Sequence, residues 1–342
     1  MKRRSGGEKG LPSVAAIMPC RNEIKHIDAA VTSVLEFDYP RERLSLTVAD
    51  GMSDDGTRAR LDALAACEPR VSVLDNPDRL PAHALNRAIE VTDAEVVLRL
   101  DAHAVYPANY ARSCVDVLLE TGAWNVGGVV ITHPGAKTPM AEAIAFAMAH
   151  PFGVGNSSFR IGAEGRKRVE TVPFGCWRRE VLRDLGGFAT DIPYAEDDEL
   201  NARIVARGGD VVLDPAIEVA YFARGTLRAL ALQMFRYGRY KPVSGRRLGR
   251  VTTWRQIVPP AFVAAFGLSA LTAVLWPPMG GIGVALLALH LFVGGLAAAR
   301  ATRSLGLAAA LRLPVVFLSM HVTYGAGYLC GLASLLFERG SG

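Results

Sequence analysis

The chain has 342 residues, of which 50% are hydrophobic, and a formal net charge of +5. That length suits one large domain or two ordinary ones, and the mean hydropathy of +0.21 is high for a purely soluble enzyme. The cysteines are scattered and odd in number, namely Cys20, Cys67, Cys114, Cys176 and Cys330. None forms a C-x-x-C pair, which argues against a zinc knuckle or a disulfide framework and favours a reducing compartment.

The N-terminal residues 1–12 are basic and rich in glycine, and we expect them to be disordered. The apolar residues that follow, up to Cys20, predict a first buried strand. A signal peptide is the alternative, but Pro12 and Pro19 interrupt the short apolar run, and a polar helix start follows it directly.

Apolar runs and helical patterns then alternate along the chain. The pattern predicts strands at 13–18, 44–50, 70–76 and 94–101, with helices at 27–37, 56–66 and 81–91. Such alternation indicates an α/β fold with an open parallel sheet and helices on both faces. In sheets of this kind, ligands bind at the carboxyl ends of the strands.

The alternation loosens after residue 125. We expect a strand at 126–132, a helix at 137–150, a mobile Gly-rich loop at 151–168, and a strand, turn and helix within 170–188. A helix that opens with four acids is expected at 194–209, and a strand at 210–222.

The C-terminal part is almost free of acids and contains three apolar blocks, at 256–276, 280–299 and 313–337. Each is long enough to span a bilayer, which takes roughly 20 residues, and buried core helices are the weaker alternative. Arg300, Arg303 and Arg312 lie between the second and third blocks, so the positive-inside rule puts this connection and the preceding domain in the cytoplasm. Three spans would leave the C-terminus outside. Glycines within the third block permit close helix packing.

Polar residues follow several predicted strands. They are Pro19–Glu23, Asp50 with Gly51, Asn76, and Asp101 with His103. Asp101 and His103 lie on the same side of the chain, so they form either a metal site or an ordinary strand end with a solvated acid and a packed histidine. Asp50 and Ser53 could equally form a turn with a helix cap.

Five segments occur together in one order: PCRNE (19–23), DGMSDDGT (50–57), DAH (101–103), EDD (196–198) and QMFRY (233–237). With them the chain resembles glycosyltransferase family 2, the inverting enzymes with a Rossmann-like GT-A fold. It is most similar to the ExoA-type membrane glycosyltransferases of succinoglycan and related exopolysaccharide synthesis. The resemblance implies a cytoplasmic GT-A catalytic domain at 13–230, an interfacial amphipathic and basic segment at 226–255, and a transmembrane region at 256–337.

The resemblance also implies a donor site with a divalent cation, Mn²⁺ or Mg²⁺, that neutralises the leaving diphosphate. The family's Asp-X-Asp metal motif here reads Asp101-Ala102-His103, and an imidazole ligand suits Mn²⁺ better than Mg²⁺. Alternatively, His103 binds a phosphate or simply packs. The residues implied to bind the nucleotide or donor are Pro19, Arg21, Asn22, Glu23, Asp50, Ser53, Asp101 and Gly175. Among them, Asp50 is implied to form a hydrogen bond with the nucleobase. The glycine of Phe174-Gly175 either closes over the sugar or makes a plain turn.

By the same resemblance, Asp197 is the base that deprotonates the acceptor hydroxyl, with Glu196 beside it. The alternative is a run of acids, including Asp198 and Glu199, that only solvates a helix start. Gln233, Arg236 and Tyr237 match the family's Gln-X-X-Arg-Trp segment at the acceptor and diphosphate side. Tyr in place of Trp, together with the short tail, favours a single addition over processive synthesis.

A run of basic residues precedes the first apolar block: Arg239, Lys241, Arg246, Arg247, Arg250 and Arg255. It would attract either anionic lipid headgroups or a polyprenyl diphosphate-linked acceptor. Nucleic-acid binding is disfavoured, because the basic residues adjoin membrane segments and do not form a separate basic domain.

We therefore expect an inverting, metal-dependent hexosyltransferase at the cytoplasmic face of a bacterial-type inner membrane. Its expected donor is a UDP-sugar, UDP-glucose in particular, and its expected acceptor is a lipid-linked saccharide. A non-catalytic sugar-nucleotide-binding membrane scaffold and a processive polysaccharide synthase are the alternatives. A nucleotidyltransferase would need a Gly-rich basic loop after the first strand, where this chain has PCRNE.

Overall fold

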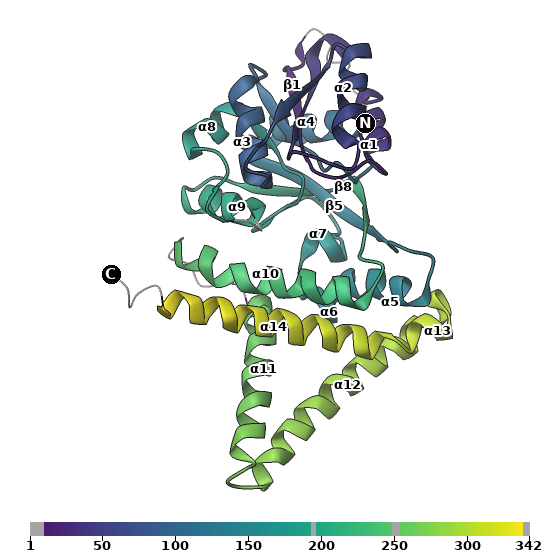
Figure 1. The fold of residues 1–342 in the computed structure, drawn as a ribbon, viewed down its shortest axis with the longest axis vertical. Helices are drawn as coiled ribbons and strands as arrows, with labels where there is room; N and C mark the ends of the chain where they lie inside the picture. The colour runs from purple at the N-terminus through teal and green to yellow at the C-terminus, as the bar shows by residue number, and fades with distance from the viewer. Residues whose placement is uncertain (1–9, 193–195, 248–253, 338–342) are drawn as a thin grey trace. The chain divides into compact units, whose positions relative to one another are not determined.

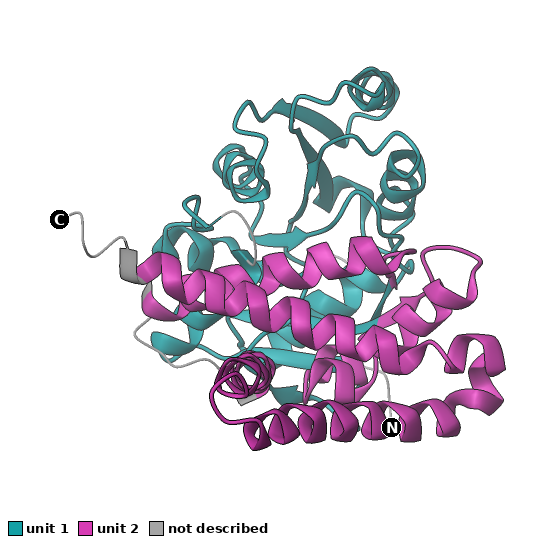
Figure 2. Ribbon diagram, turned by 60° about the horizontal axis from the view of Figure 1, so that its bottom comes forward, with its two compact units in different colours: residues 1–130, 162–220 teal, residues 131–161, 221–342 magenta. Residues whose placement is uncertain are grey.

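A computed structural model describes residues 10–192, 196–247 and 254–337 (Figure 1). Most of the tail expected to be disordered, as well as Arg250, lies outside these residues. The chain forms two compact units, one of residues 1–130 and 162–220 and the other of residues 131–161 and 221–342 (Figure 2). The catalytic domain predicted at 13–230 includes residues 131–161, which here belong to the second compact unit. The predicted boundary near residue 230 stays a prediction.

The described chain contains an eight-stranded sheet with the order β3-β2-β1-β4-β7-β5-β8-β6. The strands are β1 (Val14–Cys20), β2 (Leu44–Asp50), β3 (Val71–Asp75), β4 (Val96–Arg99), β5 (Asn125–His133), β6 (Lys167–Arg168), β7 (Cys176–Arg178) and β8 (Val211–Phe222). The first four in this order are parallel, as predicted. The near-continuous apolar sequences of β1 and β4 fit strands that are covered on both faces.

The helices between these strands follow the predicted pattern. They are α1 (Ile27–Leu35), α2 (Thr57–Cys67) and α3 (Pro81–Val91), with a short 3₁₀ helix at Arg41–Arg43. A further helix, α4 (Tyr110–Thr121), was not predicted, although Tyr110, Cys114 and Leu118 form a buried stripe at helical spacing. The strand ends that carry the polar motifs are therefore set by a parallel βαβ framework.

The second half of the sheet is mixed, whereas the sequence predicted the open parallel sheet from the first four strands alone. β7 runs antiparallel to both β4 and β5. The chain returns to the sheet at β7 after residues 134–175, and this short strand pairs through Cys176 with Leu98 of β4 and with Val126 of β5. The helices α8 (Arg179–Leu185) and α9 (Glu196–Ala206) follow it at the predicted places.

Residues 151–168 were predicted to form a mobile loop, which is wrong. They contain two short helices, α6 (Pro151–Val154) and α7 (Ser158–Ile161), and the strand β6. Proline at the first position of α6, with the His150 side chain accepting a hydrogen bond from the Phe152 backbone at 3.1 Å, explains why a helical turn starts here.

The second unit is helical. Besides α6 and α7 it contains α5 (Pro139–Met148), α10 (Leu227–Arg247), α11 (Trp254–Thr272), α12 (Pro278–Leu305), α13 (Leu307–Ala310) and α14 (Leu313–Phe337). Its apolar core gathers residues of α5, α10, α12 and α14, including Ile144, Met148, Leu230, Val316 and Phe317.

Within the described residues, two helical stretches are long and apolar enough to cross a membrane, Pro278–Leu305 and Leu307–Leu335. The sequence predicted three such spans. The first predicted span, 256–276, corresponds to α11, which ends at Thr272 and contains Pro259 and Pro260 close to its polar start. This helix is therefore shorter than the predicted span.

Candidate active site

The loops that follow β1 and β2 are joined by hydrogen bonds. The backbone N–H of Asn22 donates to Ser53 Oγ at 2.9 Å, and the Asn22 side chain donates to Asp54 Oδ1 at 2.9 Å. The Asp54 N–H donates back to Asn22 Oδ1 at 3.0 Å, and the Glu23 N–H donates to Thr57 Oγ1 at 2.9 Å. The structure thus brings the predicted nucleotide residues of both loops together at neighbouring strand ends.

Asp50 anchors the second loop. It is buried, and its carboxylate accepts hydrogen bonds from the Ser53 N–H at 3.1 Å and the Ser53 hydroxyl at 2.5 Å. This agrees with the turn interpretation of Asp50 and Ser53. A carboxylate offers about four acceptor sites, so these two bonds leave capacity for a further donor such as a nucleobase N–H.

Two residues of these loops hold left-handed backbone conformations, Asn22 with φ of 57° and Met52 with φ of 58°. Asn tolerates this region, whereas for Met it is uncommon. Backbone strain of this kind persists only where the surrounding contacts hold the backbone in place, and it is found often at ligand-binding sites.

His103 pairs with Glu23. Its Nδ1 lies 3.0 Å from Glu23 Oε1, which joins the loop after β4 to the loop after β1. The His103 side chain is about half exposed, at 46%. A carboxylate on one ring nitrogen is the arrangement that usually orients a metal-binding histidine. Simple packing of His103 in a core does not describe this geometry.

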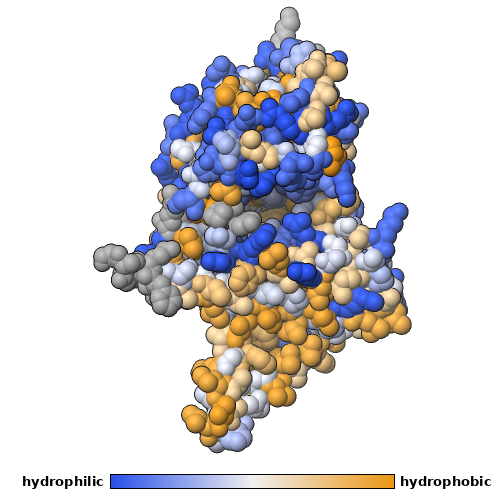
Figure 3. Space-filling view, in the orientation of Figure 1, coloured by the Kyte–Doolittle hydropathy of each residue, from blue (hydrophilic) through white to orange (hydrophobic). Residues whose placement is uncertain are grey.

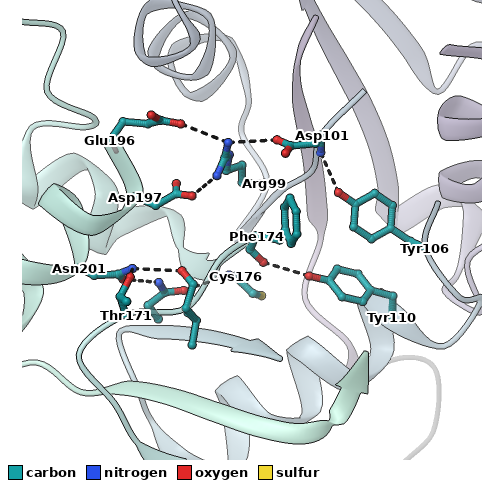
Figure 4. Close-up of polar contacts among 12 residues, drawn as sticks. Arg99, Asp101, Tyr106, Tyr110, Thr171, Phe174, Cys176, Glu196, Asp197 and Asn201 are labelled. Atoms are coloured by element: carbon teal, nitrogen blue, oxygen red, sulfur yellow. Dashed lines mark hydrogen bonds and ion pairs between the residues drawn. The ribbon is translucent and has the colours of Figure 1, made fainter. Parts of the chain in front are cut away.

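The centre of the arrangement is Arg99, at the end of β4 (Figure 4). Its Nη2 lies 3.0 Å from Asp101 Oδ1 and 3.2 Å from Glu196 Oε1, and its Nη1 contacts Asp197 Oδ2. The Arg99 side chain is only 9% exposed. One buried guanidinium therefore links the predicted metal motif to both predicted catalytic acids.

The environment of Asp197 raises its pKa. Burial is the main cause and raises the pKa to about 8; Arg99 opposes the rise, whereas Glu196, Asp101 and Asp198 add to it. Asp197 Oδ1 is buried and accepts no hydrogen bond from the described residues. Buried oxygens normally accept a hydrogen bond, and the hydroxyl of a substrate would supply the donor for this one.

A network of amides holds the helix α9 that carries Glu196 and Asp197. Asn201 Oδ1 accepts from Asn125 Nδ2 at 2.6 Å, and Asn201 Nδ2 donates to Thr171 Oγ1 at 2.9 Å. The Asn125 Oδ1 accepts from the Cys176 N–H at 3.1 Å. Asn201 lies about one turn after Asp197, so these bonds fix the helix start against β5 and β7 (Figure 4).

The acids of α9 are not all solvated, so that alternative is wrong for Glu199. Glu199 is fully buried and forms an ion pair with Arg203 at 2.6 Å. Arg203 also donates to the carbonyl oxygens of Leu185 and Gly187, at 2.6 and 2.7 Å. Glu199 thus serves packing between α9 and the end of α8.

Gly175 lies beside Arg99, whose N–H donates to the Gly175 carbonyl at 3.0 Å. A Cβ atom at residue 175 would lie 2.3 Å from Trp177 and 2.4 Å from Asn125 Oδ1, so only glycine fits. The neighbouring Phe174 is buried, has a φ of 51°, and packs its ring 5.9 Å from the Arg99 guanidinium. This glycine is more than a plain turn.

Gln233, Arg236 and Tyr237 lie on α10, in the other unit. Gln233 Nε2 donates to the hydroxyls of Tyr221 and Tyr237, both at 3.1 Å, and Arg236 is exposed. Burial raises the pKa of Tyr237. The structure therefore brings Gln233 and Tyr237 together within the second unit.

In the described part of the chain, no three Asp, Glu, His or Cys side chains converge in a way that would hold a metal ion. The Asp101 carboxylate and the Glu23-oriented His103 imidazole supply two suitable donors. Mg²⁺ and Mn²⁺ sites often take their other ligands from substrate phosphates and water, so the residues present fit a cation that arrives with a diphosphate.

The fold and the clustered strand-end acids define a GT-A type transferase. The glycosyl transferase family 2 model matches residues 15–186, which is half of the chain, and the glycosyl transferase family 21 model matches residues 171–335. The succinoglycan biosynthesis protein ExoA of Rhizobium meliloti is 32% identical, over 82% of this chain and 84% of that protein. The chain belongs to glycosyltransferase family 2, and it is an enzyme of the hexosyltransferase class.

More distant relatives agree with this. A glucuronosyltransferase of Methanococcus voltae, whose name describes a dolichyl phosphate-linked acceptor, is 23% identical over 68% of this chain and 74% of that protein. The mannosyltransferase PcManGT of Pyrobaculum calidifontis, solved with GDP-Man and Mn²⁺, has a TM-score of 0.62 at 22% identity, and the match covers 96% of this chain and 89% of that one. Staphylococcus aureus TarS 1–349, solved with UDP, reaches 0.50 at 13% identity, with 96% of this chain and 92% of that one covered. These likenesses confirm the predicted fold.

The sequence reasoning missed Arg99. The signal was present, because an arginine stands inside the apolar strand VVLRLD, where a charged side chain is costly unless it is paired. Arg99 precedes Asp101 by two residues, so both side chains lie on the same side of the strand. An arginine at this position is therefore expected to point toward the acids of the site.

Proposed function

We propose that this protein transfers a hexose from a nucleotide diphosphate sugar to a lipid-linked saccharide, with inversion and by single additions, in polysaccharide or glycolipid synthesis. The observation that carries the proposal is the buried carboxylate of Asp197, which is held by Arg99 and has one oxygen without a donor from the described residues. The similarity to a succinoglycan biosynthesis protein supports the kind of product.

The proposed reaction is a single displacement. The acceptor hydroxyl oxygen forms a bond to the anomeric carbon while the bond from that carbon to the diphosphate oxygen breaks, and the nucleoside diphosphate leaves. The hydroxyl proton moves to Asp197, whose raised pKa makes it a stronger base than an ordinary carboxylate. Attack opposite the leaving group inverts the anomeric centre.

The proposed donor is a UDP-sugar, UDP-glucose in particular. Asp50, Ser53 and the 19–23 loop would hold the nucleoside, and the coupled loops support this because they present several polar groups at one strand-end site. Asp101 and His103 would hold a Mn²⁺ or Mg²⁺ ion, which would supply charge neutralisation for the leaving diphosphate. The Mn²⁺ in the structure of the fold relative supports divalent metal dependence.

On the acceptor side we propose Gln233, Arg236 and Tyr237. Arg236 is an exposed cation on α10 and would pair with diphosphate oxygens. We further propose attachment to the inner face of a plasma membrane, supported by the apolar helices of the second unit and by Arg300 and Arg303 at the end of α12.

The test uses the full-length protein in detergent, with UDP-glucose, other UDP-sugars and GDP-mannose, a bacterial lipid extract, and either Mn²⁺, Mg²⁺ or chelator. Asp197→Asn should lower turnover by about 10²–10⁴-fold, because it removes the base. Asp198→Asn is the matched control and should retain most of the activity. Near-normal turnover in Asp197→Asn, or nucleotide binding without transfer of any sugar, would contradict the proposal.

A further inference from the structure

Exposed apolar side chains of the second unit gather on α11 and α12, which form a hairpin (Figures 1 and 3). They include Val258, Phe266, Leu268, Leu271, Ile282, Val284, Leu289, Phe292 and Leu296. At the tip, Val274, Leu275 and Trp276 are 80%, 90% and 60% exposed. An apolar surface this continuous fits the hydrocarbon of a bilayer.

The charges of the hairpin lie at its base. Arg255 stands at the start of α11, and Arg300 and Arg303 stand at the end of α12, whereas the chain between 256 and 299 has no Asp, Glu, Lys or Arg. Cations next to membrane segments favour the cytoplasmic, anionic leaflet. Both ends of the hairpin therefore fit the same face of the membrane.

The third apolar segment, α14, lies in a stretch that is long and apolar enough to cross a membrane, but it packs against a partner that a spanning helix could not keep. A Cβ atom at Gly327 would lie 2.1 Å from the Phe235 carbonyl oxygen, one at Gly331 2.0 Å from that of Arg239, and one at Gly238 2.1 Å from that of Tyr324. The α10 and α14 backbones thus touch along parallel paths (Figure 1). This confirms that glycines of the third block permit close packing.

The partner helix α10 is strongly basic. It carries Arg228, Arg236, Arg239, Lys241 and Arg246 and has no acidic residue. All of these except Lys241 are exposed. Charged side chains are costly at the centre of a bilayer, so α10 would not cross it, and α14 would have to leave α10 in order to cross. Basic side chains beside an apolar helix instead suit the headgroup layer.

We propose that this protein meets an anionic lipid bilayer through one inserted hairpin, α11–α12, while α10 and α14 lie together in the headgroup layer on the side where the chain enters. The expected number of crossings is then even. The chain before α11 and the chain after α14 lie on the same side of the membrane, and not on opposite sides as three spans require.

The experiment measures on which side of the membrane the first unit and the C-terminus lie, and it needs no sugar-transfer assay. Full-length Cys330→Ser protein with an epitope after Gly342 is assayed in right-side-out and inside-out vesicles. Cys330 is replaced because it is exposed, as is Cys67 of α2, which serves as the marker for the first unit. A membrane-impermeant maleimide and an antibody should reach Cys67 and the epitope in the same vesicle type. Access to them in opposite vesicle types would overturn the proposal.

Two variants test the inserted part. Val284→Arg places a charge on a side chain of α12 that is 70% exposed, and Val91→Arg is the matched change on α3 in the first unit, where the side chain is 58% exposed. Val284→Arg should lower the fraction that stays with vesicles after an alkaline carbonate wash, whereas Val91→Arg should not. Complete release of the unaltered protein by that wash, or equal retention of Val284→Arg, would show that the hairpin is not inserted.

Discussion

Arg99 contacts the carboxylate of Asp197 from a strand that lies 98 residues earlier in the chain. Both side chains are mostly buried, with exposures of 9% and 20%. The same guanidinium holds Asp101 and Glu196, so a single cation compensates three acids. Acids this close would otherwise repel one another and favour their protonated forms.

Replacing Arg99 should change the pH profile of the enzyme. Arg99 lowers the pKa of Asp197, which burial raises to about 8. In Arg99→Met that pKa rises further, so the acid limb of kcat/KM moves to higher pH. Activity at pH 7 falls about tenfold for each unit of the shift. Arg99→Lys, which keeps the charge, should shift the limb less. An unchanged profile in Arg99→Met would disprove the coupling.

Asp197 should also affect stability. Its pKa in the folded protein lies above the ordinary 3.8, so between pH 3.8 and about 8 the folded state binds more protons at this residue than the unfolded state. The contribution of Asp197 to the free energy of unfolding therefore falls as pH rises through this window. Denaturant titrations from pH 5 to 8 should show a smaller fall for Asp197→Asn than for the parent. The idea fails if both proteins show the same pH dependence.

His103→Asp tests direct metal ligation. Exchanging imidazole for carboxylate should move the preference from Mn²⁺ towards Mg²⁺, since carboxylate is the harder ligand. Calorimetric titration of UDP in the presence of each ion measures this preference without turnover. The control is Glu23→Gln, which weakens the contact to His103 Nδ1 and should reduce affinity for both ions. An unchanged Mn²⁺/Mg²⁺ ratio in His103→Asp would count against ligation.

Gly175→Ala should destabilise the protein. The new methyl group meets Trp177 and Asn125, both held in the core, and overpacking of this kind costs about 1–3 kcal/mol. Gly165→Ala is the matched control in the same unit, because nothing lies within 4 Å of its Cβ position. Chemical denaturation should separate the two variants. Equal stability of both would mean that the backbone near residue 175 relaxes freely.

Asn201→Leu should detach the start of α9. It removes the hydrogen bonds to Asn125, Thr171 and Val172 and leaves the Asn125 amide buried without that acceptor, at about 1–3 kcal/mol for each orphaned group. Transfer activity should fall more than donor affinity does, because Asp197 shifts while the nucleotide loops stay in place. Equal losses in kcat and donor affinity would point to general unfolding instead.

The parallel half of the sheet could be predicted from sequence because its signals are local. Apolar runs such as residues 94–101 end in polar motifs, and the helices between them show regular periodicity. The reversed direction of β7 could not be predicted, since Cys176–Arg178 is too short to show a pattern, and its partners Leu98 and Val126 lie far away in the chain.

The candidate site shows the same limit. The motifs placed Asp50, Asp101 and His103 at strand ends, where the structure has them. The pairing of Glu23 with His103 and the buried Glu199–Arg203 pair are contacts between side chains, and short motifs do not encode such contacts. Arg99 was detectable only from the rule that a cation inside an apolar strand must be paired with acids.

The division into units falls inside two strands, within β5 between Val130 and Ile131 and within β8 between Ala220 and Tyr221. A shortened protein that ends near residue 230 would keep α5 but lose α12 and α14, which cover its Ile144 and Met148. It would expose that apolar face to water and aggregate. The full-length chain is therefore expected to be needed for soluble handling of the catalytic unit, and a protein cut near residue 230 is expected to purify poorly.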